Sequence, residues 1–139
     1  MGRLVAIDYG RKRCGVAVSD PLRIIATPLD TIRTHELEAF LLAYFTRESV
    51  DEFVVGYPRT MNNEPSEAVK YIDPFLARLA KLFPGTRITT VDERFSSKSA
   101  MQAMIEGGVK KSKRREKELV DRISASIILQ AYMNRITTH

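Results

Sequence analysis

Short apolar runs alternate with longer amphipathic stretches along this chain, and the alternation predicts strands and helices in turn. Residues 3–8 and 14–19 are apolar and partly β-branched, with a polar, glycine-containing turn between them. We therefore expect these two strands to pair as a hairpin. A third, weaker strand is predicted over 24–29 and is expected to break near Pro28, because proline cannot donate a hydrogen bond to a neighbouring strand.

The middle of the chain predicts two helices on either side of a buried strand. Thr34 is suited to cap a helix over about 35–48, and Ser66 is suited to cap a second one over about 67–82. Both stretches carry apolar residues at helical spacing, which gives each helix one apolar face. Residues 53–56 are apolar throughout, which is typical of a central strand covered by helices.

The last third predicts one more strand and two more helices. These elements are a strand over 88–91, a helix from Ser96 or Ser97 to Gly107-Gly108, and a helix over about 116–135. The final helix is expected to present an apolar face made by Val120, Ile123, Ile127 and Ala131. A strand hairpin followed by alternating strands and helices predicts an α/β fold, with a mixed sheet and helices on both faces. The 139 residues contain no linker or repeat, so we expect a single domain over 1–139.

Composition excludes several classes of protein. Hydrophobic residues make up 44% and charged residues 28%, an ordinary globular mixture. No apolar run reaches the roughly 18 residues that a membrane span needs. The apolar strand begins directly after Met1-Gly2-Arg3, so no signal peptide is expected. Cys14 is the only cysteine and there are two histidines, which leaves no disulfide and almost no basis for a zinc site. We expect a cytoplasmic protein.

The positive charge is concentrated in one stretch. Residues 110–117 hold six basic residues and one acidic residue, which equals the whole formal net charge of +5. A concentrated basic patch is the electrostatic footprint of a phosphate polymer, and we predict that this one lies on a loop. A solvated loop without a partner is the alternative. A membrane-surface helix fits less well, because the patch has no apolar face.

Three carboxylates stand on separate predicted elements. Asp8 closes the first strand, Glu93 follows the strand over 88–91, and Asp121 lies in the last helix. Taken singly, Asp8 could cap a turn, Glu93 could form a surface ion pair, and Asp121 could pair with a nearby basic residue. Taken together, three carboxylates without histidine or cysteine would form a hard oxygen site that suits Mg²⁺ or Mn²⁺. Two such ions would stabilise both the attacking and the leaving oxygen of a phosphodiester.

Four segments in a fixed order carry a family resemblance over nearly the whole chain. They are Asp8–Asp20, Val54–Pro58 with Met61-Asn62, Val91–Ala100, and Asp121 with Ser124-Ala125 and Ile127–Gln130. In this order they resemble the motifs of the YqgF (RuvX) family, whose members are described as Holliday junction resolvases and pre-16S rRNA nucleases. That family is similar to RNase H-like nucleases, whose fold is a mixed five-stranded sheet flanked by helices. The motif matches place the acidic residues of the family on Asp8, Glu93 and Asp121.

The resemblance implies a metal-dependent endonuclease that hydrolyses phosphodiester bonds in structured nucleic acid. Its substrate would be the 5′ end of pre-16S rRNA or a four-way DNA junction. Asp8 is expected to ligate both metal ions, and Glu93 and Asp121 to ligate one each. The candidates to hold flanking phosphates are Arg11, Arg13, Arg94, Lys113, Arg114 and Arg115.

Two other functions stay open at this point. One is a non-catalytic nucleic-acid-binding or ribosome-associated module, which would bind without metal and without Asp8. The other is an ATPase of the actin and sugar-kinase type, which also has an acid-x-glycine turn after its first strand but needs two such domains. The sequence leaves open the choice between RNA and DNA and between monomer and homodimer. A junction resolvase is expected to be a two-fold dimer, whereas an RNA-trimming nuclease need not be.

Overall fold

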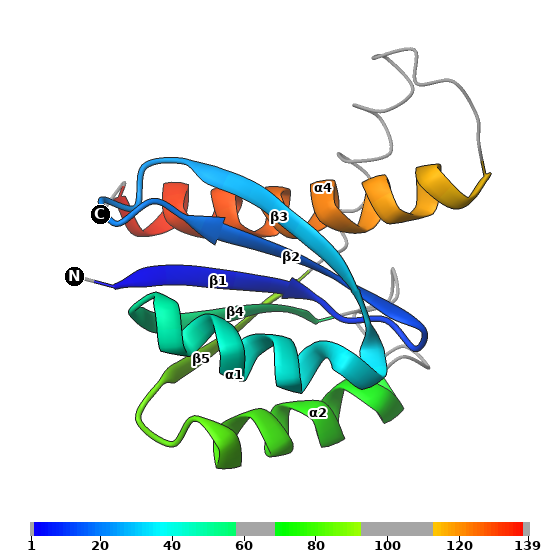
Figure 1. The fold of residues 1–139 in the computed structure, drawn as a ribbon. Coiled ribbons are helices and arrows are strands. Elements are labelled where there is room, and N and C mark those ends of the chain that lie inside the picture. Colours follow the sequence, from blue (N-terminus) through cyan, green and yellow to red (C-terminus); the bar gives the residue numbers. More distant parts are fainter. Residues whose placement is uncertain (1, 58–68, 93–112, 138–139) are drawn as a thin grey trace.

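The computed structural model describes residues 2–57, 69–92 and 113–137, with the backbone alone for 113–122 and 137. Five strands form one sheet in the order β3-β2-β1-β4-β5 (Figure 1). The strands are β1 (Arg3–Asp8), β2 (Arg13–Ser19), β3 (Ala26–Arg33), β4 (Val50–Tyr57) and β5 (Arg87–Asp92). β1 pairs antiparallel with β2, and β2 pairs antiparallel with β3; β1, β4 and β5 run parallel. The mixed five-stranded sheet is the one predicted.

Helices cover both faces of this sheet (Figure 1). The helical elements are a 3₁₀ turn η1 (Thr34–Glu36), α1 (Leu37–Arg47), α2 (Val69–Leu82) and α4 (Lys113–Thr137). α1 and α2 lie on one face and α4 lies on the other. Successive side chains of a strand point to opposite faces. In β1, Val5 and Ile7 therefore join the core under α1 and α2, whereas Leu4 and Ala6 join the core under α4.

None of the helices in the described part of the chain combines the length and apolarity that a membrane crossing requires. The predicted helix from Ser96 or Ser97 to Gly107-Gly108 and the predicted cap at Ser66 lie outside the described residues.

The predicted break of the third strand at Pro28 is wrong. β3 continues through Pro28 to Arg33, and it is an edge strand, where a missing hydrogen-bond donor can face outward. Its register with β2 shifts between Val16, opposite Asp30, and Ala17, opposite Pro28, so Leu29 is the extra residue of a bulge. The bulge breaks the period of two that the sequence prediction relies on.

The predicted cap at Thr34 is also wrong. Arg33 occupies the cap position of η1 and makes no side-chain cap hydrogen bond. The hydroxyl of Thr34 instead donates to the carbonyl of Gly10 at 2.7 Å. The Thr34 hydroxyl therefore satisfies a part-buried carbonyl of the β1–β2 turn and does not cap the helix.

The last helix differs from its prediction in two respects. α4 begins at Lys113, so the last part of the basic stretch belongs to a helix and not to a loop. Of the predicted apolar face, the side chains of Ile123, Ile127 and Ala131 are only half-buried. The residues that α4 buries against the sheet are Ser124, Ala125, Ile128, Leu129, Tyr132 and Met133. Both faces carry apolar residues, and only packing against the sheet distinguishes them.

Candidate functional site

One residue of the predicted acidic site, Asp8, lies at the edge where the parallel strands end. Asp8 is the last residue of β1 and Asp92 the last residue of β5, with β4 between them. Two strand spacings separate their backbones, a distance of about 10 Å. Glu93 directly follows Asp92 and lies outside the described residues.

Asp8 faces α4. The alternation that sends Leu4 and Ala6 to that face sends Asp8 there too, and its neighbour Tyr9 goes to the other face. The ring of Tyr9 stacks on Phe75 of α2 with centroids 4.3 Å apart. Burial raises the pKa of the Tyr9 phenol, so this side chain stays neutral beside the candidate site.

A buried hydrogen-bond cluster sets how far α4 reaches along the sheet. The hydroxyl of Tyr132 on α4 and that of Thr89 on β5 both donate to the carboxylate of Glu52 on β4. Glu52 pairs in register with Leu4, near the start of β1. This cluster ties the C-terminal half of α4 to the end of the sheet where the parallel strands begin.

The N-terminal half of α4 therefore extends toward Asp8. α4 runs opposite to β1, so it reaches the strand ends with its earlier residues (Figure 1). Asp121 precedes Tyr132 by eleven residues, or about 16 Å of helix. The four residues from Leu4 to Asp8 span about 13 Å of strand. The backbone of Asp121 consequently lies at the level of Asp8, one turn before the buried Ala125.

The structure thus brings two of the three predicted acidic positions to one end of the molecule. The side chain of Asp121 is not among those described, and neither is Glu93. Among the described side chains, no group of three or more histidine, cysteine, aspartate or glutamate residues comes together. The donors that the sequence supplies at this edge are carboxylate oxygens, which is the chemistry that Mg²⁺ and Mn²⁺ require.

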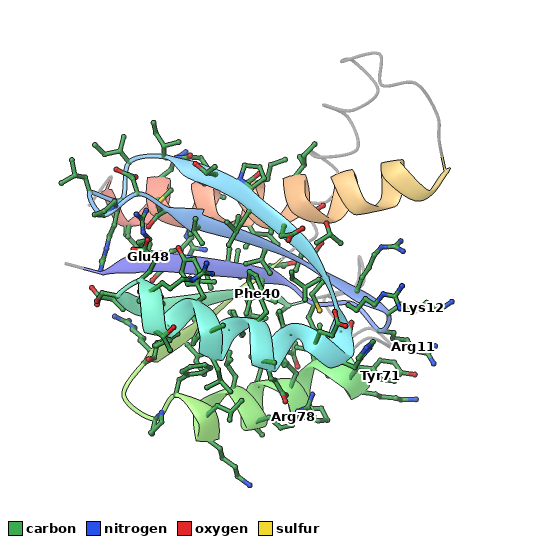
Figure 2. The ribbon with its side chains drawn as sticks, viewed as in Figure 1. Arg11, Lys12, Phe40, Glu48, Tyr71 and Arg78 are labelled. Atoms are coloured by element: carbon green, nitrogen blue, oxygen red, sulfur yellow. The ribbon has the colours of Figure 1, made fainter. Side chains whose placement is uncertain are left out.

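A basic pocket lies beside this edge, and we call it the turn pocket. It has a volume of about 560 Å³ and lies where the β1–β2 turn meets the end of β3 and η1. Its lining residues are Arg11, Lys12, Arg13, Thr31, Arg33, Thr34 and His35. None of the described residues that line it is acidic. The guanidinium of Arg11 lies 4.7 Å from the centroid of the Tyr71 ring on α2, and both side chains are labelled at this end of the sheet in Figure 2.

The predicted phosphate-binding residues divide into three groups. Arg11 and Arg13 both line the turn pocket. Lys113, Arg114 and Arg115 form the first turn of α4, and only their backbone is described. Arg94 lies outside the described residues.

The sequence prediction missed the other half of the turn pocket. Thr31, Arg33 and His35 follow the predicted break at Pro28, so no local pattern placed them beside Arg13. The available signal was a second cluster of basic residues with threonines shortly after the hairpin, but its position depends on the register of β3.

Solved structures share the fold of this chain. RuvC of Thermus thermophilus in complex with a Holliday junction substrate superposes with a TM-score of 0.60, covering 99% of this chain and 98% of that one at 18% identity. A second Thermus thermophilus RuvC structure gives a TM-score of 0.54, also at 18% identity. At this identity the likeness concerns the fold, which is RNase H-like.

Sequence comparison identifies the family within that class. The family model described as "RuvX: Holliday junction resolvase" matches residues 2–135. A protein of Porphyromonas gingivalis named "Putative pre-16S rRNA nuclease" is 55% identical over 134 residues, which cover 96% of this chain and 97% of that protein. A protein of Parabacteroides distasonis with the same name is 53% identical over 133 residues, covering 96% and 95% of the two chains. The chain belongs to the RuvX family, a nuclease family.

Proposed function

We propose that this protein is a divalent-metal-dependent endonuclease that hydrolyses phosphodiester bonds in structured nucleic acid. The observation that carries the proposal is the placement of Asp8 on the α4 face of the sheet, level with the backbone of Asp121. The proposed catalytic unit is one domain over 1–139 that acts in the cytoplasm, as a monomer or a homodimer.

Asp8, Glu93 and Asp121 would hold the metal. Their carboxylate oxygens suit Mg²⁺ or Mn²⁺. Thr89 and Val91 of β5 have their side chains on the α4 face, and Glu93 is the next alternate residue in the sequence. When bound, such ions activate a water molecule and stabilise charge on the attacking and leaving oxygens. The chain itself orients the scissile phosphate: Arg11, Arg13 and Arg94, with Lys113, Arg114 and Arg115, would contact phosphates on either side of it.

The first candidate substrate is pre-16S rRNA, whose 5′ end the protein would mature. This choice is supported by the relatives of more than 50% identity that are named for that reaction. Their similarity extends over nearly all of both chains.

The second candidate substrate is a four-way DNA junction. It is favoured by the description of the family and by the likeness of the fold to a RuvC that binds a Holliday junction. The reaction at phosphorus would be the same for either substrate, so the two candidates differ only in which nucleic acid the surface accepts.

A cleavage assay tests the proposal. Wild-type protein, Asp8→Asn and the control Asp30→Asn would be incubated with Mg²⁺ or Mn²⁺ and either a four-way DNA junction or a structured RNA with a 5′ extension. Asp30 is an exposed aspartate of β3 that is outside the proposed site. We expect cleavage by wild type and control, and a rate at least about a hundredfold lower for Asp8→Asn, since losing a metal ligand removes several kcal/mol of transition-state stabilisation.

Each outcome of this assay has one interpretation. The nucleic acid that is cut chooses between the two substrates. Equal, faint cleavage by all three proteins would indicate a contaminating nuclease. No cleavage, with salt-sensitive binding retained by Asp8→Asn, would contradict the enzyme and support the non-catalytic nucleic-acid-binding or ribosome-associated module.

A further inference from the structure

Two contacts with aromatic rings join the β1–β2 turn to α2. The inner contact stacks Tyr9 on Phe75, with ring centroids 4.3 Å apart. The outer contact places the guanidinium carbon of Arg11 4.7 Å from the ring centroid of Tyr71. Residues 9 and 11 alternate along the turn, and residues 71 and 75 are one helical turn apart. The Arg11–Tyr71 pair therefore lies one turn nearer to the start of α2.

This outer pair lies beyond the end of the sheet. α2 runs opposite to β4 (Figure 1), and its start is tied to the end of that strand, where the hydroxyl of Tyr57 donates to the carboxylate of Asp73 at 2.9 Å. Phase along α2 puts Tyr71 on the same stripe as Phe75. Phe75 is 1% exposed under the sheet, whereas Tyr71 is 39% exposed. The stripe that packs on the sheet thus continues past its edge and leaves an aromatic ring accessible to solvent.

Exposure and position distinguish the Arg11–Tyr71 pair from a second pair of the same kind. Arg47 lies 5.8 Å from the centroid of the Tyr44 ring, at the C-terminal end of α1 and away from Asp8 (Figure 1). Tyr44 is only 7% exposed, so its ring belongs to the core. A cation over an exposed ring stabilises a fold only weakly. The accessible ring is the feature that a ligand can use.

The pair is connected to Asp8 by accessible surface. Arg11 follows Asp8 by three residues, so their Cα atoms are at most about 11 Å apart. Residues 8–10 are half-buried and residues 11 and 12 are exposed, so no residue of this stretch is buried. Figure 2 shows Arg11, Lys12 and Tyr71 together at this end of the molecule. A ligand at Asp8 can therefore extend over the turn to Tyr71 without entering the core between the sheet and α4.

The pair has the chemistry of a stacking site for a nucleobase. Every base has a flat π face, and both aromatic rings and the guanidinium plane of arginine stack on it. Proteins that bind single strands combine such stacks with a basic groove that follows the phosphate backbone. Arg11 belongs to both parts here, because it lies over Tyr71 and also lines the turn pocket. Stacking uses the plane of its guanidinium and phosphate binding uses the edge, so the two contacts are compatible.

Only an unpaired base can reach this ring. The bases of a duplex are already stacked and paired, and extruding one of them is costly. The ring itself is held in place before any ligand binds, since the Tyr57–Asp73 hydrogen bond fixes the start of α2. This lowers the entropic cost of binding a base. The pair is therefore suited to a single-stranded segment.

We propose that Arg11 and Tyr71 bind an unpaired nucleobase of the substrate, within a few nucleotides of the scissile bond at Asp8. This inference rests on the proposed function, which supplies nucleic acid as the ligand and Asp8 as the place of cleavage. It adds Tyr71 to the binding surface and gives Arg11 a second contact besides phosphate. Of the two candidate substrates, it favours an RNA with a single-stranded 5′ extension over a junction with fully paired arms.

Binding is measured apart from cleavage. In the Asp8→Asn background with EDTA, three fluorescein-labelled probes would be titrated by anisotropy at several salt concentrations. They are an RNA duplex with a single-stranded 5′ extension, the same duplex with blunt ends, and a four-way DNA junction with fully paired arms. The variants are Tyr71→Leu, which removes the ring, Tyr71→Phe, which keeps it, and Arg11→Gln. Arg47→Gln is the matched control, because it removes the cation of the pair with Tyr44.

We expect Tyr71→Leu to bind the extended duplex about tenfold more weakly, the loss of one base stack. The slope of log K against log salt concentration should not change, since no charge is lost. Arg11→Gln should bind more weakly with a slope shallower by up to about 0.7. Tyr71→Phe and Arg47→Gln should bind like the background protein. A Tyr71→Leu variant that binds the extended duplex as tightly as Tyr71→Phe would overturn the proposal.

The other two probes separate recognition of a base from folding. Tyr71→Leu should bind the blunt duplex and the junction as well as Tyr71→Phe does, because neither probe offers an unpaired base. An equal loss of affinity for all three probes would assign Tyr71 a purely structural role and overturn the proposal. The same extension made of DNA should show the same loss, since the ring contacts the base. A loss confined to RNA would indicate a contact with the 2′-hydroxyl and contradict the base stack.

A fluorescent base locates the stack. 2-Aminopurine, whose emission is quenched by stacking, would replace one base at a time along the extension. At one position we expect lower emission in the complex with Tyr71→Phe than in the complex with Tyr71→Leu. Equal emission in the two complexes at every position would contradict the proposal.

Two results separate a failure of this inference from a failure of the proposed function. If wild type cleaves but Tyr71→Leu binds the extended duplex like Tyr71→Phe, the stacking site fails and the nuclease stands. If nothing is cleaved but binding of the extension requires the Tyr71 ring, the nuclease fails and the Arg11–Tyr71 pair stands as a binding site.

Discussion

Glu52 is a buried carboxylate that keeps two hydroxyl donors. Only 6% of it is exposed, and it accepts hydrogen bonds from Tyr132 and Thr89. Burying a charged or polar group is unfavourable unless it is hydrogen-bonded, so these two hydroxyls are what allow Glu52 to lie between the sheet and α4. The same contacts set how far α4 extends toward Asp8.

Tyr132→Phe should destabilise the fold by about 1–3 kcal/mol, because Glu52 would keep one hydroxyl donor in place of two. Urea unfolding at neutral pH measures this. Tyr71→Phe is the matched control, since Tyr71 is 39% exposed and the removal of its hydroxyl should change stability by less than about 0.5 kcal/mol. Equal effects of the two changes would show that the Glu52 cluster does not stabilise the fold.

The same residue predicts a loss of stability at alkaline pH. Burial, together with the hydrogen bond to Glu52, raises the pKa of Tyr132 above its ordinary value of 10.0. The neutral phenol is therefore the form that the folded state favours. Its contribution is complete below pH 10 and is lost as the pH rises through the folded-state pKa. The stability difference between wild type and Tyr132→Phe should stay constant from pH 6 to 9 and narrow above pH 10.

At the scale of elements, one threonine joins the β1–β2 turn to the start of the helical layer. Thr34 begins η1, and its hydroxyl reaches the carbonyl of Gly10, with the buried thiol of Cys14 3.5 Å away. A turn that carries Arg11 and Arg13 is thereby attached to the segment that carries Arg33. This junction therefore joins two of the segments that line the turn pocket.

Thr34→Val should cost about 1 kcal/mol, because it keeps the shape of the side chain and removes the donor to Gly10. Thr34→Ser keeps the hydroxyl and is the control. Denaturant unfolding of the three proteins measures the difference. A Val variant as stable as the Ser variant would show that water satisfies the Gly10 carbonyl equally well.

The sequence predicted most elements because their periods are regular. β1, β2, β4 and β5, and the faces of α1 and α2, follow simple alternation or helical spacing that local inspection detects. The second half of β3 was missed because Pro28 and the bulge at Leu29 interrupt the period. The buried face of α4 was missed because apolar residues lie on two sides of the helix, and only the sheet selects one.

In the candidate site too, some residues could be placed from local periodicity and others only from strand register and packing. Asp8 could be placed from the sequence because it ends a recognisable strand. The pairing of Arg13 with Arg33 could not, because it depends on the register of two strands, and a shift of one residue would send the two side chains to opposite faces. The level of Asp121 relative to Asp8 depends on the contact between Tyr132 and Glu52, which joins residues 80 positions apart.

At the scale of the whole molecule, basic residues lie near the strand-end edge in two places. One is the turn pocket, and the other is the start of α4, where Lys113, Arg114 and Arg115 form the first turn. Both are at the end of the molecule where β1 ends (Figure 1). A polyanion bound across this end would contact both.

A triple variant in which alanine replaces Lys113, Arg114 and Arg115 should bind nucleic acid more weakly. The slope of log K against log salt concentration should become shallower by up to about 0.7–0.9 for each phosphate contact that is lost. The charge-matched control replaces Arg47, Lys81 and Arg87 with alanine; these exposed residues lie on α1, α2 and the start of β5. Anisotropy titrations across a salt series measure both proteins. An unchanged slope in the first protein would remove the start of α4 from the binding surface.

The irregular course of β3 also limits how two copies of the chain can associate. An open edge strand ordinarily offers its unpaired backbone to another sheet. Pro28 lacks a donor, and the bulge at Leu29 twists the strand locally, so this edge is a poor template for a continuous ten-stranded sheet shared by two molecules. A two-fold partner that cuts the opposite strand of a junction would then dock through another surface, such as the helices, the loops or the second edge strand β5, and the β3 edge with the turn pocket would stay open.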